Sequence, residues 1–183
     1  VDDGFIPVWR KDDKVWLEIA PERLNKPFHL AANVSNSIGE RGLYASSMGR
    51  DWMAELRIVN DTNLQLVALN TAFRGDGDPA MRRTVQQSFS DSLLGSAKVV
   101  SAPHPQRKSV LVDASFLLSD LLGLSTRIEA AFRLPYGLDR GNSHVERVRA
   151  VARMTSVSTQ LHFATPRIPA PPAQPLPPTA PRS

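Results

Sequence analysis

The sequence contains no cysteine and only four histidines, and both scarcities limit its chemistry. Without cysteine the chain has no disulfide, no thiolate metal ligand and no cysteine nucleophile. The histidines are His29, His104, His144 and His162, and no two stand one helical turn apart, as the ligands of a hydrolytic zinc site commonly do. We therefore expect surface imidazoles at His29, His104 and His162, and the sequence shows no ligand partner for His144. No apolar run approaches the ~20 residues of a membrane-spanning helix.

The sequence also has little excess of charge of either sign. It holds 22 Lys and Arg against 18 Asp and Glu, a formal net charge of +4. The densest basic stretch carries Arg147, Arg149 and Arg153, which alternate with apolar residues and follow Glu146. A nucleic-acid groove needs a denser cluster with stacking aromatics. We expect a solvated face here and no nucleic-acid partner.

Prolines are distributed unevenly along the chain. Eight of the 15 fall within 166–183. Proline lacks the amide donor that helices and sheets require, so we predict a Pro-rich linker or disordered tail over 165–183, after a β-rich domain over 1–164. A ligand for a proline-binding groove is the alternative reading of the tail. The chain opens at Val1 without an initiator methionine or leader, and we expect it to be a segment of a larger protein.

Alternation of apolar and polar residues, which is typical of half-buried strands, recurs along the body of the chain. The alternating segments are 5–10, 14–19, 28–34, 52–58, 64–69, 110–114, 128–134 and 157–163. The polar turn Lys11-Asp12-Asp13 between the first two segments predicts a hairpin. Repeated alternation with turn signals predicts a mainly β fold (α+β with a few short helices), with antiparallel sheets in a sandwich- or barrel-like arrangement.

Helix signals are few and short. One turn is expected at 21–24, a helix at 79–88, and another at 115–122 that ends before Gly123. The stretch 143–152 has a capping-box pattern but is rich in β-branched residues, and we predict a strand there. The glycine-rich stretch 38–51 is expected to form a long loop.

The sequence contains no recognisable catalytic constellation. It lacks the GxSxG nucleophile elbow, a phosphate-cradling glycine loop and a zinc-binding helix. We therefore predict no catalytic, cofactor-binding or metal-ligating residue. A hydrolase is the least favoured alternative, and it would need a pocket that gathers Asp113, Asp120 or His144.

The opening run Gly4–Phe28 has a distinctive order of features. A short apolar strand Gly-Phe-Ile-Pro-Val-Trp is followed by the turn Lys-Asp-Asp-Lys, a strand ending in Ile-Ala-Pro, and the run Leu-Asn-Lys-Pro-Phe. This run resembles a domain of uncharacterised function in the N-terminal region of large bacterial zinc-dependent metalloproteases of the metzincin type. Shorter resemblances follow in order over the rest of the body, at 88–92, 110–113, 119–121, 138–140 and 145–150.

The resemblance implies a role for the parent protein more than a site in this chain. In that family a downstream domain with an HExxH helix and a third histidine binds zinc and cleaves peptide bonds, and none of those residues occurs here. The resemblance thus implies a non-catalytic accessory domain whose partners are the downstream catalytic domain of the same polypeptide and a protein substrate. It also implies export to the periplasm or the extracellular space.

A second hypothesis is a free-standing β-sandwich module that binds a protein or a glycan. Its candidate contacts are Trp9, Trp16 and Tyr44, because aromatic side chains combine a large apolar surface with a polar group. At least one of the tryptophans is expected to pack in the core instead. A downstream HExxH reading frame would distinguish the first hypothesis from the second.

Overall fold

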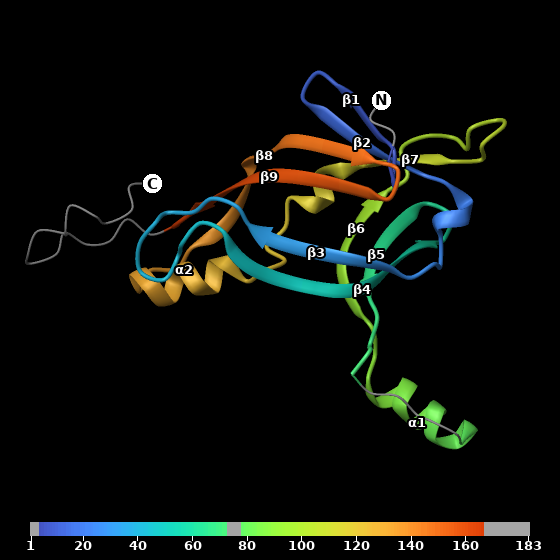
Figure 1. Cartoon of the computed structure of the whole chain (residues 1–183), viewed down its shortest axis with the longest axis horizontal. Helices are drawn as coiled ribbons and strands as arrows, with labels where there is room; N and C mark the ends of the chain where they lie inside the picture. The colour runs from blue at the N-terminus through green and yellow to red at the C-terminus, as the bar shows by residue number, and fades with distance from the viewer. Residues whose placement is uncertain (1–3, 73–77, 167–183) are drawn as a thin grey trace, which may run out of the picture. The chain divides into compact units, whose positions relative to one another are not determined.

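The computed structural model describes residues 4–72 and 78–166 (Figure 1). The chain divides into two compact units, each assembled from three stretches of sequence. Unit 1 comprises Val1–Leu30, Asp51–Leu117 and Arg147–Ser158. Unit 2 comprises Ala31–Arg50, Leu118–Glu146 and Thr159–Ser183.

The first sheet has the strand order β1-β2-β7 and is antiparallel throughout. Strand β1 (Val8–Lys11) and strand β2 (Lys14–Ile19) form the expected hairpin, and Asp12 in the turn has φ 53°. Strand β7 (Val110–Asp113) joins the other edge of β2, with Leu17 opposite Val112. Two segments far apart in sequence therefore meet at β2.

The second sheet has the order β3-β4-β5-β6. Its strands are β3 (Phe28–Val34), β4 (Ser47–Val59), β5 (Asn63–Ala68) and β6 (Ser92–Lys98). The turn between β4 and β5 contains Asn60 and Asp61, both with positive φ, which asparagine and aspartate tolerate better than most residues. An isolated bridge between Val99 and Val112 links the end of β6 to β7.

The third sheet is the two-stranded ribbon of β8 (Gly137–Val151) and β9 (Met154–Ala164). Within unit 1, Thr155 of β9 binds both backbone groups of Ile6: its Oγ1 accepts from the Ile6 amide (2.9 Å) and donates to the Ile6 carbonyl (2.8 Å). The segment before β1 is thereby held against the ribbon.

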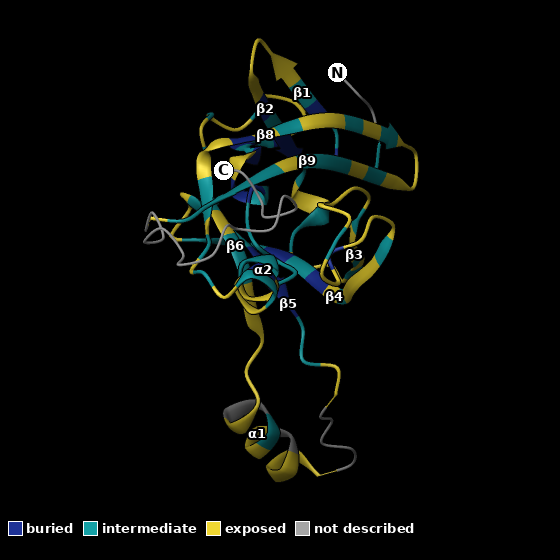
Figure 2. Cartoon of the chain, turned by 90° about the vertical axis from the view of Figure 1, so that its left-hand side faces the viewer, coloured by how far each residue is buried: buried dark blue, intermediate teal, exposed yellow. Residues whose placement is uncertain are grey.

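The helices are short and occur between strands along the sequence. They are the 3-10 helices η1 (Pro21–Arg23) and η2 (Ala114–Leu117), and the α-helices α1 (Pro79–Ser88) and α2 (Leu124–Phe132). Helix α1 lies beyond the ends of β5 and β6, away from their sheet (Figure 1), and much of its surface is exposed (Figure 2). Its Met81 is exposed. None of the helices among residues 4–72 and 78–166 has the length and apolar character to cross a membrane.

The core of unit 1 lies between the first two sheets and η2. Its largest fully buried side chains are Val8, Ile19, Leu64 and Val112. Buried residues are concentrated in β2 and β5 (Figure 2), where the second and the last three positions of each strand are buried. The first half of each strand follows the apolar alternation from which it was predicted, and the last three positions depart from it.

The predicted fold class is confirmed, because the protein is mainly β with antiparallel sheets and a few short helices. No sheet in the described part of the chain is closed into a barrel. The division into a domain over 1–164 and a linker over 165–183 stays a prediction. Strand β9 ends at Ala164, and 167–183 lie outside the described residues.

The predicted strand at 128–134 is wrong, because residues 128–132 form the second half of helix α2. The alternating apolar residues Ile128 and Phe132 are also four apart, and with Leu124 they form one face of a helix. Asp120 starts the helix: its carboxylate accepts from the backbone amides of Leu124 (2.5 Å) and Ser125 (2.9 Å). These two bonds satisfy amides of the first helical turn, which have no partner within a helix, and they favour a helix over the strand that the alternation predicts.

Three further expectations need correction. The helix predicted at 115–122 is only the 3-10 turn η2, and Gly123, with φ 65°, precedes α2 instead of ending a helix. The loop predicted over 38–51 ends earlier, because β4 begins at Ser47. Strand β6 was not predicted, since Gly95 and the small polar residues around it interrupt its alternation.

Candidate functional site

The candidate site is centred on Glu18, which lies in β2 between the core residues Leu17 and Ile19. Alternation along β2 places Glu18 on the face shared with Trp16, which predicts exposure, yet only 7% of Glu18 is exposed. The pairing of Trp9 with Trp16 in the hairpin brings the Trp9 indole next to this face. Trp9 Nε1 donates to Glu18 Oε2 at 2.7 Å.

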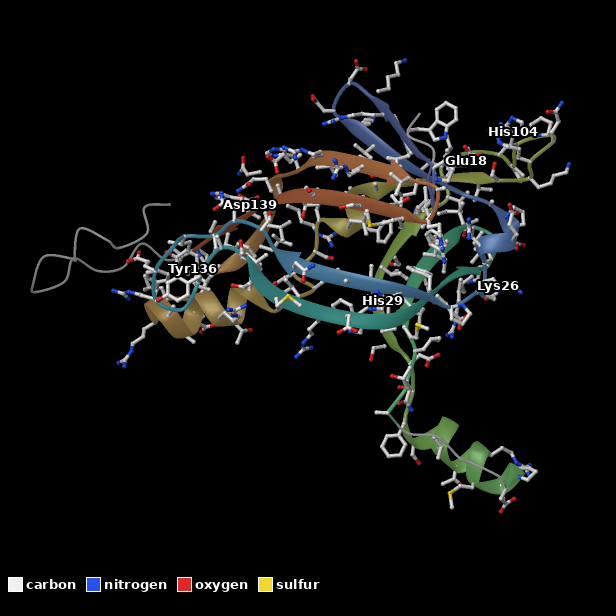
Figure 3. All side chains as sticks on the ribbon, viewed as in Figure 1. Glu18, Lys26, His29, His104, Tyr136 and Asp139 are labelled. Carbon is white, nitrogen blue, oxygen red and sulfur yellow. The ribbon has the colours of Figure 1, made fainter. Side chains whose placement is uncertain are left out.

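The turn that precedes β7 covers the other side of Glu18 (Figure 3). His104 Nδ1 accepts from the backbone amides of Gln106 and Arg107, each at 3.2 Å, and the His104 carbonyl accepts from the Lys108 amide at 2.8 Å. The imidazole of His104 thus shapes the turn itself. The turn directs Arg107 and the following Ser109 toward Glu18.

Three donors therefore converge on one carboxylate. Arg107 Nε donates to Glu18 Oε1 at 2.9 Å and Ser109 Oγ donates to the same oxygen at 2.5 Å, in addition to the bond from Trp9. Burial raises the pKa of Glu18, but the hydrogen bonds from Ser109, Trp9 and Arg107 outweigh it and hold that pKa below its ordinary value. Glu18 is thus a charged anchor that fixes the hairpin to the turn.

A cleft of about 620 Å³ opens beside this anchor, within the range of small-molecule sites. Its lining residues are Gly4, Phe5, Pro7, Trp9, Glu18, Ala20, Glu22, Arg23, Arg107 and Ser109. One part of the lining is apolar and aromatic, and the other carries charged groups. The guanidinium carbon of Arg23 lies 4.3 Å from the ring centre of Phe5, which keeps that side chain over the aromatic ring.

Of the three aromatic residues predicted as binding contacts, only Trp9 lines this cleft. Trp16 is half-buried on the adjacent strand, and Tyr44 is 57% exposed in unit 2. Sequence reasoning missed Glu18, Arg23 and Arg107. The detectable signal was a carboxylate flanked by two core residues and placed near a tryptophan of the partner strand.

The residues of the hydrolase alternative have local structural roles or none. Asp113 Oδ1 accepts from the Ser115 amide at 2.8 Å, and Asp120 caps α2. His144 is exposed on β8. These contacts give the hydrolase alternative no support.

A serine, a histidine and an aspartate do meet in unit 2, near the start of β8. Ser143 Oγ donates to the Asp139 carbonyl at 2.6 Å and accepts from the His162 backbone amide at 2.9 Å. The His162 ring lies on Asp139 instead, with Nδ1 3.5 Å from Oδ2. Because the serine contacts the backbone of the histidine and not its ring, the trio lacks the nucleophile–base contact of a catalytic triad.

The expectation of a surface imidazole is confirmed at His29 but not at His104 or His162. His29 is exposed and its Nε2 lies 3.3 Å from Asp51 Oδ2, and His144 is exposed. His104 is half-buried in its turn, and the Nδ1 atom of His162 is buried. Within 4–72 and 78–166, no three His, Asp or Glu side chains are grouped so that they could hold a metal ion.

Comparison of the chain with models of protein families, with curated proteins and with solved structures finds no match.

Proposed function

We propose that this chain is a non-catalytic accessory domain of an exported bacterial zinc-dependent metalloprotease, and that its Glu18 cleft holds a polypeptide segment. The segment belongs to the downstream catalytic domain of the same polypeptide or to the protein substrate. Zinc and peptide-bond cleavage belong to that downstream domain. The expected site of action is the periplasm or the extracellular space.

The observation that carries the proposal is where the cleft residues lie in the sequence. Eight of the ten lie between Gly4 and Arg23, inside the run Gly4–Phe28 that resembles the protease family. The other two, Arg107 and Ser109, come just before 110–113, a further segment with the resemblance. The segments that carry the resemblance thus build the wall of a cleft, which supports a binding role for this part of the domain.

The mechanism is one of rigid presentation. Glu18 fixes the β1–β2 hairpin to the turn before β7 through three hydrogen bonds, so the walls of the cleft are positioned before a ligand arrives. A preorganised cleft binds with less loss of conformational entropy than a mobile one. The domain would orient its ligand and break no bond.

The alternative function is a free-standing binding module for a protein or a glycan. The presence of Trp9 beside charged groups in a cleft favours it, since aromatic surfaces are common contacts in binding sites. The two functions differ in what the same gene encodes further downstream.

The experiment begins with the reading frame that contains this chain. We expect a downstream HExxH segment, and we expect the isolated chain with added zinc to release no peptides from casein. The catalytic domain from that frame should bind the isolated chain, with weaker binding to Trp9→Ala and unchanged binding to Tyr44→Ala, which alters an exposed aromatic outside the cleft. A frame without HExxH, or chelator-sensitive proteolysis by the chain alone, would overturn the proposal.

A further inference from the structure

The cleft beside Glu18 contains hydrogen-bond donors that no acceptor among residues 4–72 and 78–166 engages. Arg107 engages Glu18 through Nε, which leaves its two terminal amino groups, and 55% of its side chain is exposed. Arg23 lies over Phe5, and no carboxylate of the described residues is within ion-pair distance of it. Two guanidinium groups with unengaged N–H donors therefore line one cleft.

Among the side chains of the lining, unengaged acceptors are fewer than unengaged donors. The carboxylate of Glu18 is buried and already accepts from three side chains. Glu22 is the other carboxylate of the lining, and it is exposed. A ligand that supplies a planar acceptor pair suits this arrangement, because guanidinium groups bind carboxylates through two parallel hydrogen bonds.

The apolar part of the lining limits the chemical nature of the ligand groups next to the carboxylate. Phe5, Pro7 and Trp9 offer ring surfaces, and the indole N–H of Trp9 is already bound to Glu18. A ligand therefore meets an apolar wall next to two guanidinium groups, of which Arg107 is paired with Glu18 and Arg23 is not ion-paired, and it also meets the exposed carboxylate of Glu22. An extended peptide provides both a carboxylate and apolar backbone and side-chain surface within the volume of this cleft.

We propose that the cleft recognises a carboxylate on a peptide, bound by Arg23 and Arg107, with the adjoining residue against Trp9. The choice of a peptide rests on the proposed function, whereas the carboxylate follows from the lining residues. The carboxylate comes either from a Glu or Asp side chain or from a free C-terminus, and both present the same two oxygens.

The test titrates the full chain with each of three pentapeptides that are capped at the N-terminus, and it monitors binding through the NMR signal of the Trp9 indole N–H. A Trp9→Phe variant assigns that signal. The first peptide has a central glutamate and an amidated C-terminus, the second a central glutamine and a free C-terminus, and the third a central glutamine and an amidated C-terminus. We expect at least one carboxylate peptide to bind about tenfold or more tightly than the third peptide. The stronger of the first two identifies the source of the carboxylate.

Variants then locate the binding groups. Arg23→Gln should weaken binding of the preferred peptide about tenfold, and Arg23→Lys should restore part of it. Arg153→Gln, an exposed arginine in the β8–β9 turn of unit 1, is the control and should leave binding unchanged.

Equal affinity for all three peptides, or unchanged binding by Arg23→Gln, would overturn the proposal. An acidic oligosaccharide that binds more tightly than any peptide would overturn the assignment to peptides. Each result is independent of whether a downstream HExxH segment exists, so a failure here is distinguishable from a failure of the proposed function.

Discussion

The strongest quantitative prediction concerns the charge of Glu18. Glu18→Gln keeps the shape of the side chain but removes its charge and replaces one acceptor oxygen with a donor nitrogen. Ser109, Trp9 and Arg107 all donate to this side chain, so at least one donor is left unpaired in a buried place. A hydrogen bond to a charged group contributes ~1.5–3 kcal/mol, and an unsatisfied buried group costs ~1–3 kcal/mol.

The lost hydrogen-bond energy and the cost of the unsatisfied donor do not simply add, because the uncharged glutamine no longer has the desolvation cost of the buried carboxylate. We therefore expect Glu18→Gln to lower the free energy of unfolding by about 2–3 kcal/mol at pH 7. Urea denaturation should show a lower midpoint at an unchanged slope. The matched control is Glu22→Gln, an exposed residue of the same cleft, which should change stability by ~0.5 kcal/mol or less.

The pH dependence provides a second readout. The pKa of Glu18 is held below its ordinary value of 4.5 in the folded chain, so its contribution is fully present above that value. It is lost as the pH falls through the folded pKa, and the difference between the wild-type chain and Glu18→Gln should shrink there. A variant as stable as the wild type at pH 7, or a difference that grows on acidification, would refute this account of the anchor.

Three further substitutions test other contacts. Gly49→Ala should destabilise by about 2–3 kcal/mol, because a Cβ there would lie 1.6 Å from the Ala32 carbonyl oxygen, whereas Gly137→Ala, with open space, should be neutral in urea denaturation. Ser143→Ala should cost ~1–2 kcal/mol through the unpaired Asp139 carbonyl and His162 amide, and exposed Ser156→Ala should cost nothing in the same assay. Asp91→Asn should speed limited proteolysis of the α1 segment, because the Asp91 carboxylate accepts from the Asn70 backbone amide (2.9 Å) and from Arg57 (2.7 Å) at the base of that segment. Global stability should fall by about 1 kcal/mol or less. Unchanged cleavage would contradict this role of Asp91.

Local signals predicted much of the fold correctly. The β1–β2 hairpin follows from two short apolar runs around Asp12 and Asp13, and helix α1 starts where Asp78 caps a proline-led segment. Both depend on residues within a few positions of one another. The strand prediction fails at α2 because apolar residues at every second position, such as Ile128, Ala130 and Phe132, also include pairs four residues apart, which share one face of a helix.

The cleft could not be predicted in the same way. Its anchor joins Glu18 to Arg107 and Ser109, which are 89 and 91 residues further along the chain. Local periodicity places Glu18 on the polar face of its strand and carries no information about what covers that face. The pairing of β2 with β7 places the turn that carries Arg107 and Ser109 against Glu18, and that pairing is a long-range property of the fold.

The long separation between β2 and β7 has a consequence during protein synthesis. A ribosome that adds ~5–20 residues per second needs about 5 to 20 s to pass from Glu18 to Ser109. Throughout that interval β2 has an open edge, and Glu18 has neither Arg107 nor Ser109 as a partner. A two-stranded hairpin is marginal in water, so unit 1 completes its first sheet only after β7 has left the ribosome. A nascent or truncated chain that ends before Val110 would leave one edge of β2 unpaired, and such edges pair with other chains and aggregate.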